Sequence, residues 1–331
     1  MEISVKIHAL SEESMNGVPY VIISGKGRSG SNRLLDILDA SPLTTCRNEV
    51  NEIEGSNFFG INGELFGADL EWDQLEKLQS AIANASKRRS VRDRFDQVDK
   101  AFLNTFGKRM LVPMSKTKAR KAFHRVGVMQ DPNEWRFPDL GLKSALMPQT
   151  RLVLKLNSCP GWTVALVKQD PECLVIHNIR HPAQYLQSWY NRFIHRRTGT
   201  ASFEENFKDV PKILGYFNRS YAEDLRQPTP ENLIEVELWR WRFVNEKLRT
   251  LSVKPDQYLL VRYDDVQNDV LSTAERIFGF SRVPLDEKTI LRIKDMRNTL
   301  FAKPHTTSLD PTLVNRLIDK VLEDSSLREL Y

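Results

Sequence analysis

The chain is poor in cysteine and lacks long apolar runs, and both absences limit what it can be. Its three cysteines, Cys46, Cys159 and Cys173, cannot all pair and show no metal-ligand spacing, so they favour a reducing compartment. No stretch approaches the about 20 apolar residues of a membrane helix, and residues 1–16 are too polar for a signal peptide. We therefore expect a cytoplasmic protein with no transmembrane segment.

The sequence also lacks a cluster of His, Cys and Asp residues, and it has no internal repeat and no low-complexity tract. Metal catalysis is therefore not indicated, and we expect no metal ion. The length of 331 residues favours one large α/β domain, spanning residues 1–331 and carrying insertions, over two independent folds.

Positive charge is concentrated in one part of the chain. Residues 86–125 hold thirteen Lys or Arg and three Asp or Glu, whereas the whole chain has a net charge of +5. This basic segment lies within residues 60–150, which we expect to form a helical insertion because residues 72–85 and 91–106 have helical spacing. A solvated basic face and a lid that attracts an anionic ligand both remain open. No nucleic-acid-binding module accompanies the charge, so we expect no nucleic-acid partner.

The most informative segment is residues 21–35, where an apolar, β-branched run enters a loop rich in glycine and serine and a leucine-patterned segment follows. This pattern predicts strand, loop and helix, an arrangement whose backbone N–H groups and helix dipole bind phosphate. The Gly-x4-Gly spacing matches a Walker A loop, but Ser31 and Asn32 stand where ATP binding requires Lys and then Ser or Thr. The cation comes earlier, at Arg28. We therefore expect the loop to bind a phosphate other than the γ-phosphate of ATP.

A second segment, residues 171–192, also predicts phosphate binding. Residues 173–179 are apolar and β-branched, as in a buried parallel strand. Arg180 follows at the carboxyl end, where open α/β sheets bind ligands, and Pro182 is well placed near a helix start. Ser188 comes eight residues after Arg180. An arginine and a serine hydroxyl that converge on one point make a good phosphate clamp.

Other segments continue the alternation of strands and helices. Residues 151–162 read as a strand that contains Lys155, followed by a turn. Residues 229–248 predict a long helix, with a threonine cap, whose aromatic stripe belongs to the core. Residues 258–266 predict a buried strand and residues 268–280 a helix.

In their order and spacing, these motifs resemble those of sulfotransferases that use 3′-phosphoadenosine 5′-phosphosulfate (PAPS). In that family the first strand ends in Gly-x-x-Arg/Lys-Ser-Gly-Ser/Thr, and residues 25–31 read Gly-Lys-Gly-Arg-Ser-Gly-Ser. The resemblance implies a P-loop-like α/β fold, with a central parallel sheet flanked by helices on both faces. It also implies that Arg180 and Ser188 bind the 3′-phosphate of PAPS and that Lys155 lies near the bridging oxygen of the sulfuryl group. The implied loop residues at the cofactor are Lys26, Gly27, Arg28, Ser29, Gly30, Ser31 and Asn32.

The general base is where the chain departs from cytosolic sulfotransferases. Those enzymes carry a histidine two residues after the lysine, where this chain has Asn157, which cannot take a proton at neutral pH. Protein-tyrosine and many bacterial sulfotransferases instead use a glutamate that follows a small-residue-Pro turn and a short strand. Residues 40–49 of this chain are similar to that stretch. Glu49 is the best match, offset by about one residue, with Glu52 or Glu54 as fallbacks. The resemblance is therefore closer to the bacterial and protein-tyrosine type, and the implied catalytic residues are Glu49, Lys155 and Arg28.

The expected reaction is transfer of a sulfuryl group from PAPS to an acceptor hydroxyl, in preference to an amine. Hydroxylated small metabolites, lipids, glycans and protein tyrosines all remain as acceptors, and an anionic acceptor would suit the basic segment. One alternative is a P-loop small-molecule kinase with a degenerate loop, which predicts Mg-ATP binding. Another is a non-catalytic member that binds a nucleotide without turnover, which Asn32 and Asn157 leave open. The oligomeric state is not predicted.

Overall fold

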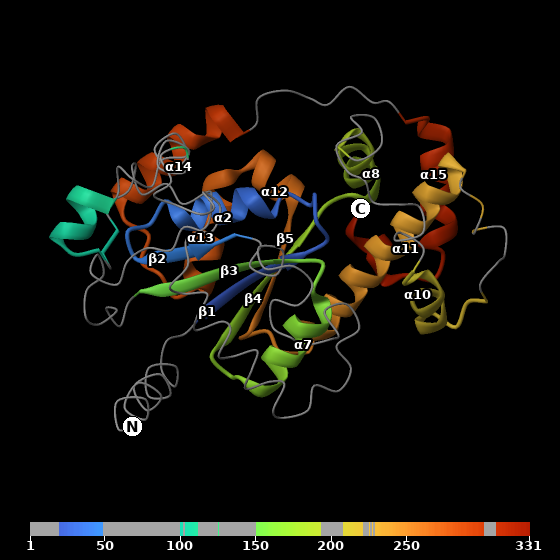
Figure 1. Cartoon of the computed structure of the whole chain (residues 1–331), viewed down its shortest axis with the longest axis horizontal. Helices are drawn as coiled ribbons and strands as arrows, with labels where there is room; N and C mark the ends of the chain where they lie inside the picture. Colours follow the sequence, from blue (N-terminus) through green and yellow to red (C-terminus); the bar gives the residue numbers. More distant parts are fainter. Residues whose placement is uncertain are drawn as a thin grey trace.

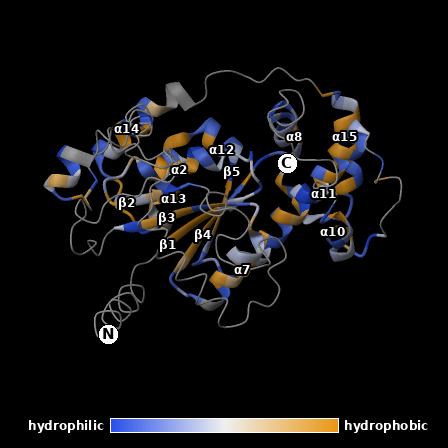
Figure 2. Cartoon of the chain, in the orientation of Figure 1, coloured by the Kyte–Doolittle hydropathy of each residue, from blue (hydrophilic) through white to orange (hydrophobic). Residues whose placement is uncertain are grey.

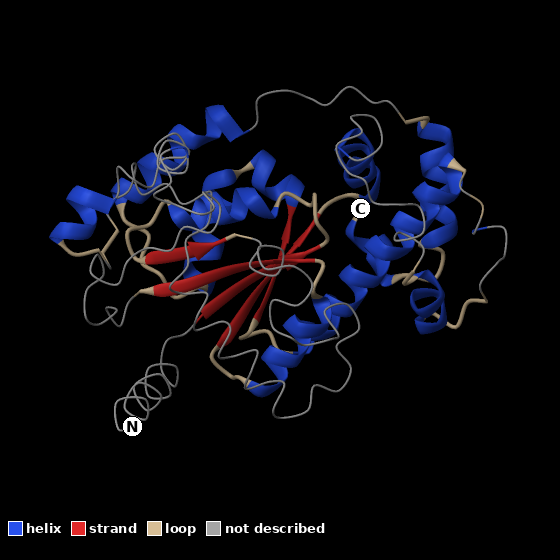
Figure 3. Ribbon diagram, viewed as in Figure 1, coloured by secondary structure: helices blue, strands red, loops and turns tan. Residues whose placement is uncertain are grey.

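A computed structural model describes ten parts of the chain. They are residues 20–48, 100–101, 103–111, 125, 150–192, 208–220, 225, 227, 229–300 and 309–331. Within them, a five-stranded sheet lies between two layers of helices (Figures 1 and 3). The strands are β1 (Tyr20–Gly25), β2 (Thr44–Arg47), β3 (Arg151–Asn157), β4 (Cys173–Ile179) and β5 (Tyr258–Arg262). The predicted fold class, a central parallel sheet flanked by helices on both faces, is confirmed.

All four strand pairings are parallel, and the strand order is β2-β3-β1-β4-β5. The central strand β1 pairs with β3 from Tyr20↔Leu152 to Gly25↔Asn157, and it pairs with β4 on its other side. The carboxyl ends of parallel strands meet at one edge of the sheet. The loop after β1 therefore lies between the residues that end β3 and those that follow β4.

The sheet is buried on both faces, as expected for a parallel sheet covered by helices. Its strands consist largely of hydrophobic residues (Figure 2). Val21 and Ile23 of β1 face one helical layer, and Ile22 between them faces the other, where it packs in the same cluster as Trp162. The first layer holds α2 (Ser31–Asp39), α12 (Tyr263–Asn268), α13 (Val270–Phe280) and α14 (Glu287–Leu300). The second layer holds α7 (Pro160–Gln169) and α11 (Pro230–Arg249).

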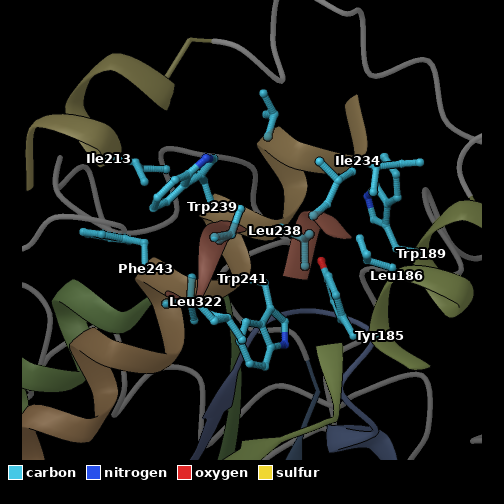
Figure 4. Close-up of a cluster of buried hydrophobic side chains, with 14 of the residues drawn as sticks. Tyr185, Leu186, Trp189, Ile213, Ile234, Leu238, Trp239, Trp241, Phe243 and Leu322 are labelled. Carbon is cyan, nitrogen blue, oxygen red and sulfur yellow. The ribbon is translucent and has the colours of Figure 1, made fainter. Parts of the chain in front are cut away.

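A further apolar cluster forms around α11, where helices from distant parts of the sequence meet (Figures 1 and 4). Trp239 and Trp241 are buried there, which confirms that the aromatic stripe of this helix belongs to the core. The surrounding helices are α8 (Pro182–Tyr190), α10 (Val210–Tyr216), α15 (Pro311–Val321) and the 3-10 helix η6 (Ser326–Leu330). Two other short elements are the π-helix η1 (Gly107–Leu111) and the 3-10 helix η5 (Thr250–Val253).

Two helices begin as the sequence predicts. The Oγ1 of Thr229 accepts a hydrogen bond of 3.1 Å from the backbone N–H of Asn232, and Pro230 takes the first position of α11. Pro182 takes the first position of α8, where His181 Nδ1 accepts from the backbone N–H of Ala183 at 3.2 Å. The second cap fixes how the chain turns directly after Arg180.

The strand predicted over residues 258–266 is too long. Pairing with β4 ends at Ile179↔Arg262, and Tyr263 already belongs to α12. The acidic residues Asp264 and Asp265 lie in the first turn of that helix, where they complement its dipole. The following helix α13 begins after Asp269, whose carboxylate accepts from two backbone N–H groups, rather than at residue 268.

Most of the predicted insertion over residues 60–150 lies outside the described residues, as do the helices expected over residues 72–85 and most of 91–106. In the parts that the structure describes, no helix combines the length and the apolar character needed to cross a membrane. The prediction of one domain over residues 1–331 is not tested by these ranges.

Candidate functional site

The loop between β1 and α2 has a backbone that only certain residues can adopt. Gly30 has φ 94°, and a Cβ atom there would lie 2.3 Å from Cδ2 of Tyr263. A Cβ atom on Gly25 would lie 2.3 Å from the carbonyl oxygen of Asn178. Arg28 also has a positive φ, at 77°. Both glycines are therefore required by close approach, and Gly30 is also required by its left-handed backbone.

Several polar groups of this loop suit an anion. Gly30 caps α2 without a side chain, so no side chain satisfies the first N–H groups of the helix. The buried Ser29 Oγ has no hydrogen-bond partner among the described residues. Two serine hydroxyl groups also lie at the loop. Ser158 Oγ accepts from the Gly27 N–H at 3.4 Å, and Ser31 Oγ donates to Asn157 Oδ1 at 3.4 Å. A phosphate at the start of α2 would find donors from both backbone and side chains.

Arg180 and Ser188, the predicted phosphate clamp, both contact this loop. The guanidinium Nη1 of Arg180 donates to the carbonyl oxygen of Arg28 at 3.3 Å. In the opposite direction, Arg28 Nη2 donates to Ser188 Oγ at 3.3 Å. The loop after β1 and the turn and helix after β4 are thus joined by two reciprocal contacts.

Residues from distant parts of the chain hold Arg180 in place. Its guanidinium carbon lies 4.3 Å from the centroid of the Tyr263 ring, and its Nε donates to Gln184 Oε1 at 3.3 Å. The Tyr331 hydroxyl donates to the backbone carbonyl of Arg180 at 3.1 Å. Burial lowers the pKa of the Arg180 guanidinium, and the nearby charge of Arg28 acts in the same direction. A bound anion would relieve this repulsion between like charges.

Lys155 ends in the same region, on the other side of β1. It is buried, and its ammonium donates to Asn32 Oδ1 at 2.8 Å and to Asn48 Oδ1 at 3.0 Å. Asn32 belongs to the first turn of α2, and Asn48 follows the end of β2. Lys155 therefore links three elements at the edge of the sheet that carries the phosphate loop.

The structure brings most of the predicted site residues to this one edge of the sheet, and the exceptions are Lys26 and the candidate glutamates. The side chain of Lys26 faces away toward α11, where its ammonium lies 3.0 Å from Glu237 Oε1. Glu49, Glu52 and Glu54 lie outside the described residues. The predicted residues that the structure does bring together are Gly27, Arg28, Ser29, Gly30, Ser31, Asn32, Lys155, Arg180 and Ser188.

Several residues that support the site were not predicted from the sequence. Ser158 directly follows β3, and Gln184 lies in the first turn of the helix after β4, so their positions near the carboxyl ends of strands could have suggested them. Nothing in the sequence near Tyr263 indicates its contact with Arg180, because that contact depends on the packing of β5 beside β4. Nothing in the sequence near Tyr331 indicates its contact with Arg180. No group of three or more His, Cys, Asp or Glu residues suited to a metal ion occurs in the described ranges.

A parallel sheet with a glycine-rich loop at the carboxyl end of its central strand is the arrangement found in nucleotide-binding α/β proteins. The sequence model of the Sulfotransferase family matches residues 19–287, which covers the loop, the clamp and all five strands. The chain therefore belongs to the sulfotransferase family, and the prediction of that family is confirmed. No curated protein matches the chain.

Bacterial sulfotransferases are among the solved structures that are similar to this chain. Sulfotransferase STF9 from Mycobacterium avium is 13% identical with a TM-score of 0.46, and the match covers 98% of this chain and 81% of that chain. A sulfotransferase from Alicyclobacillus acidocaldarius is 14% identical with a TM-score of 0.45, and the match covers 94% of each chain. Similarity at this level says nothing about the donor or the acceptor of this chain.

Proposed function

We propose that this sulfotransferase takes its sulfuryl group from PAPS and transfers it to an acceptor hydroxyl. The observation that carries the proposal is the pair of reciprocal contacts at one edge of the sheet. Arg180 donates to the backbone of Arg28, and Arg28 donates to Ser188. Two anion-binding groups of residues thus lie side by side, as a nucleotide with phosphates on both its 5′ and 3′ positions requires.

In this proposal the loop binds the 5′-phosphosulfate. The N–H groups at the start of α2, the orphaned hydroxyl of Ser29 and the side chains of Ser31 and Asn32 would donate to its oxygens. Arg28 and Lys155 would hold positive charge where the leaving phosphate and the sulfuryl oxygens gain negative charge. The donor itself supplies an activated sulfuryl group joined to phosphate.

The clamp after β4 selects the 3′-phosphate. The guanidinium of Arg180 can present two donors to one phosphate, and Ser188 adds a hydroxyl donor. The Tyr263 ring and Gln184 would hold the guanidinium in the required orientation before the nucleotide arrives. Preorganisation of this kind lowers the entropy that binding costs.

We assign the proton acceptor for the attacking hydroxyl to Glu49. The residue before it, Asn48, accepts a hydrogen bond from Lys155 at 3.0 Å, so the chain reaches the site directly before Glu49. Asn157 sits two residues after Lys155, and its amide oxygen accepts from Ser31 at 3.4 Å. An amide of this kind positions a loop hydroxyl and does not accept a proton at neutral pH.

Calorimetric binding of 3′-phosphoadenosine 5′-phosphate, AMP and Mg-ATP tests the donor. We expect micromolar binding of the bisphosphate, with AMP weaker by about tenfold or more, because AMP leaves Arg180 and Ser188 without an anion. Binding of Mg-ATP alone would contradict the proposal in favour of the kinase alternative. Turnover of PAPS with a panel of hydroxylated metabolites, lipids, glycans and tyrosine peptides then identifies the acceptor and separates an enzyme from a non-catalytic member.

A further inference from the structure

A buried carboxylate, Glu237, connects the two halves of the site although it belongs to neither. It lies on α11 and is 2% exposed. Its Oε1 is 3.0 Å from the ammonium of Lys26, the residue directly after β1. The same oxygen accepts a hydrogen bond from the hydroxyl of Tyr185. Tyr185 lies on α8 and is labelled in Figure 4. Glu237 thus reaches the phosphate loop with one contact and the helix that carries Ser188 with the other.

The arrangement is compact and its charges are compensated. Glu237 Oε2 lies 4.0 Å from Arg240, whose guanidinium is 3.3 Å from Asp209. Burial raises the pKa of the Tyr185 hydroxyl well above its usual value, and the charge of Glu237 acts in the same direction. Tyr185 therefore keeps its proton and donates a hydrogen bond to the carboxylate. Burial lowers the pKa of Lys26, whereas the Glu237 charge opposes that shift and favours the ammonium.

The buried Lys26–Glu237 ion pair would contribute little if its only role were to stabilise the fold. Buried ion pairs contribute weakly to stability, because desolvation offsets their attraction, but each partner fixes the position of the other. Tyr185 and Ser188 are three residues apart on α8, so they lie on neighbouring parts of one helix surface. Fixing Tyr185 therefore fixes Ser188, just as fixing Lys26 fixes the start of the loop.

We propose that Glu237 is a positioning residue that sets the spacing between the 5′-phosphate loop and the 3′-phosphate clamp, and so sets the preference for a nucleotide bisphosphate over a monophosphate. This inference rests on the proposed function. A ligand with two phosphates must satisfy both subsites at once, so its affinity depends on their spacing. A ligand with one phosphate occupies one subsite, and its affinity does not depend on that spacing.

The test compares Tyr185→Phe with the matched control Tyr190→Phe. Both tyrosines lie on α8, but no contact from the Tyr190 hydroxyl to the loop or to Glu237 exists in the described structure. For Tyr185→Phe we expect the Kd of 3′-phosphoadenosine 5′-phosphate to rise about five- to tenfold, the scale of one lost buried hydrogen bond, while the Kd of AMP changes less than about twofold. Tyr190→Phe should leave both constants at their wild-type values.

A second variant, Glu237→Gln, keeps the shape of the side chain and removes its charge. We expect it to reduce the ratio of the two affinities further than Tyr185→Phe does, with a cooperative thermal transition that shows the protein is folded. A parallel weakening of both nucleotides, or an unchanged ratio in both variants, would overturn the inference and leave the proposed function intact. A wild-type protein that binds both nucleotides equally would instead remove the proposed function and this inference with it.

Discussion

The loop after β1 and the turn after β4 lie at one edge of the sheet, yet they are built by different means. The loop depends on its backbone: Gly30 and Arg28 have positive φ, and a side chain at Gly30 would clash with Tyr263. The turn depends on one long side chain, that of Arg180, whose guanidinium is held by Gln184 on the following helix and by the ring of Tyr263 from a distant part of the chain.

This difference determines how the loop after β1 and the turn after β4 should each respond to amino-acid substitutions. A substitution in the loop alters the backbone itself, so stability and binding should fall together. A substitution around Arg180 leaves the backbone intact, so binding should fall while the fold remains. Substitutions in the two halves should therefore separate their contributions to stability and to binding.

Gly30→Ala should have the largest effect, because it combines a left-handed backbone with a Cβ atom 2.3 Å from the Tyr263 ring. Strain and overpacking together should lower the free energy of unfolding by about 2–4 kcal/mol and abolish nucleotide binding. Gly27→Ala is the control for stability, because a Cβ atom there meets nothing within 4 Å. Urea denaturation measures both variants, and equal stabilities would contradict the assigned role of the loop backbone.

Arg180→Ala should weaken binding of 3′-phosphoadenosine 5′-phosphate by about 2–3 kcal/mol, the scale of a charge-assisted hydrogen bond. The affinity for AMP should change little, because AMP has no 3′-phosphate. Arg262→Ala is a matched control, since Arg262 ends the adjacent strand β5 and pairs with Asp265 at 2.9 Å. Calorimetry of both variants with both nucleotides checks this, and an unchanged bisphosphate affinity in Arg180→Ala would refute the clamp.

Ser188→Ala should cost about 1.5 kcal/mol of bisphosphate affinity, because it removes one hydroxyl donor to a charged group. The free energy of unfolding should fall by no more than about 0.5–1.5 kcal/mol, the scale of the hydrogen bond that the hydroxyl accepts from Arg28. Ser272→Ala, at an exposed position of α13, serves as the control. A loss of stability without a loss of affinity would assign Ser188 a structural role.

Tyr263→Leu should give the smallest change, a loss of about 1 kcal/mol in bisphosphate affinity, because it removes the ring beneath the Arg180 guanidinium. Tyr263→Phe keeps the ring and should bind almost as the wild type does. The ratio of the two dissociation constants isolates the contribution of the ring. Equal weakening by both substitutions would point to the hydroxyl instead.

The same contrast explains what could be predicted from the sequence. The spacing of Gly25, Arg28 and Gly30 is local, so the loop could be predicted from the residues themselves. Arg180 and Ser188 could also be predicted, since they follow one strand and occupy one short segment. Their supports could not, because Tyr263 and Tyr331 reach Arg180 only through the packing of β5 and η6.

The strand predicted over residues 258–266 failed for a related reason. Residues 258–261 are apolar and Tyr263 and Val266 extend the pattern, but a strand ends where its partner ends, and β4 offers no residue beyond Ile179 to pair with Tyr263. The residue at which a strand stops pairing is therefore set by its neighbouring strand, and its own sequence does not show it. Lys26 illustrates the same limit, because the sequence predicts a lysine at the cofactor, whereas the buried carboxylate that receives its ammonium comes from α11.

The central position of β1 also has a consequence for how the protein is made. Its two hydrogen-bonded neighbours are β3 and β4, so Tyr20 pairs with Leu152 on one side and with Cys173 on the other. During synthesis from the N-terminus, the strand that carries the phosphate loop emerges first and remains without sheet partners until residues 151–179 have been made. Such non-local pairing slows folding and exposes an apolar strand to aggregation. Shortened chains that end before β4 should therefore depend on chaperones rather than fold alone.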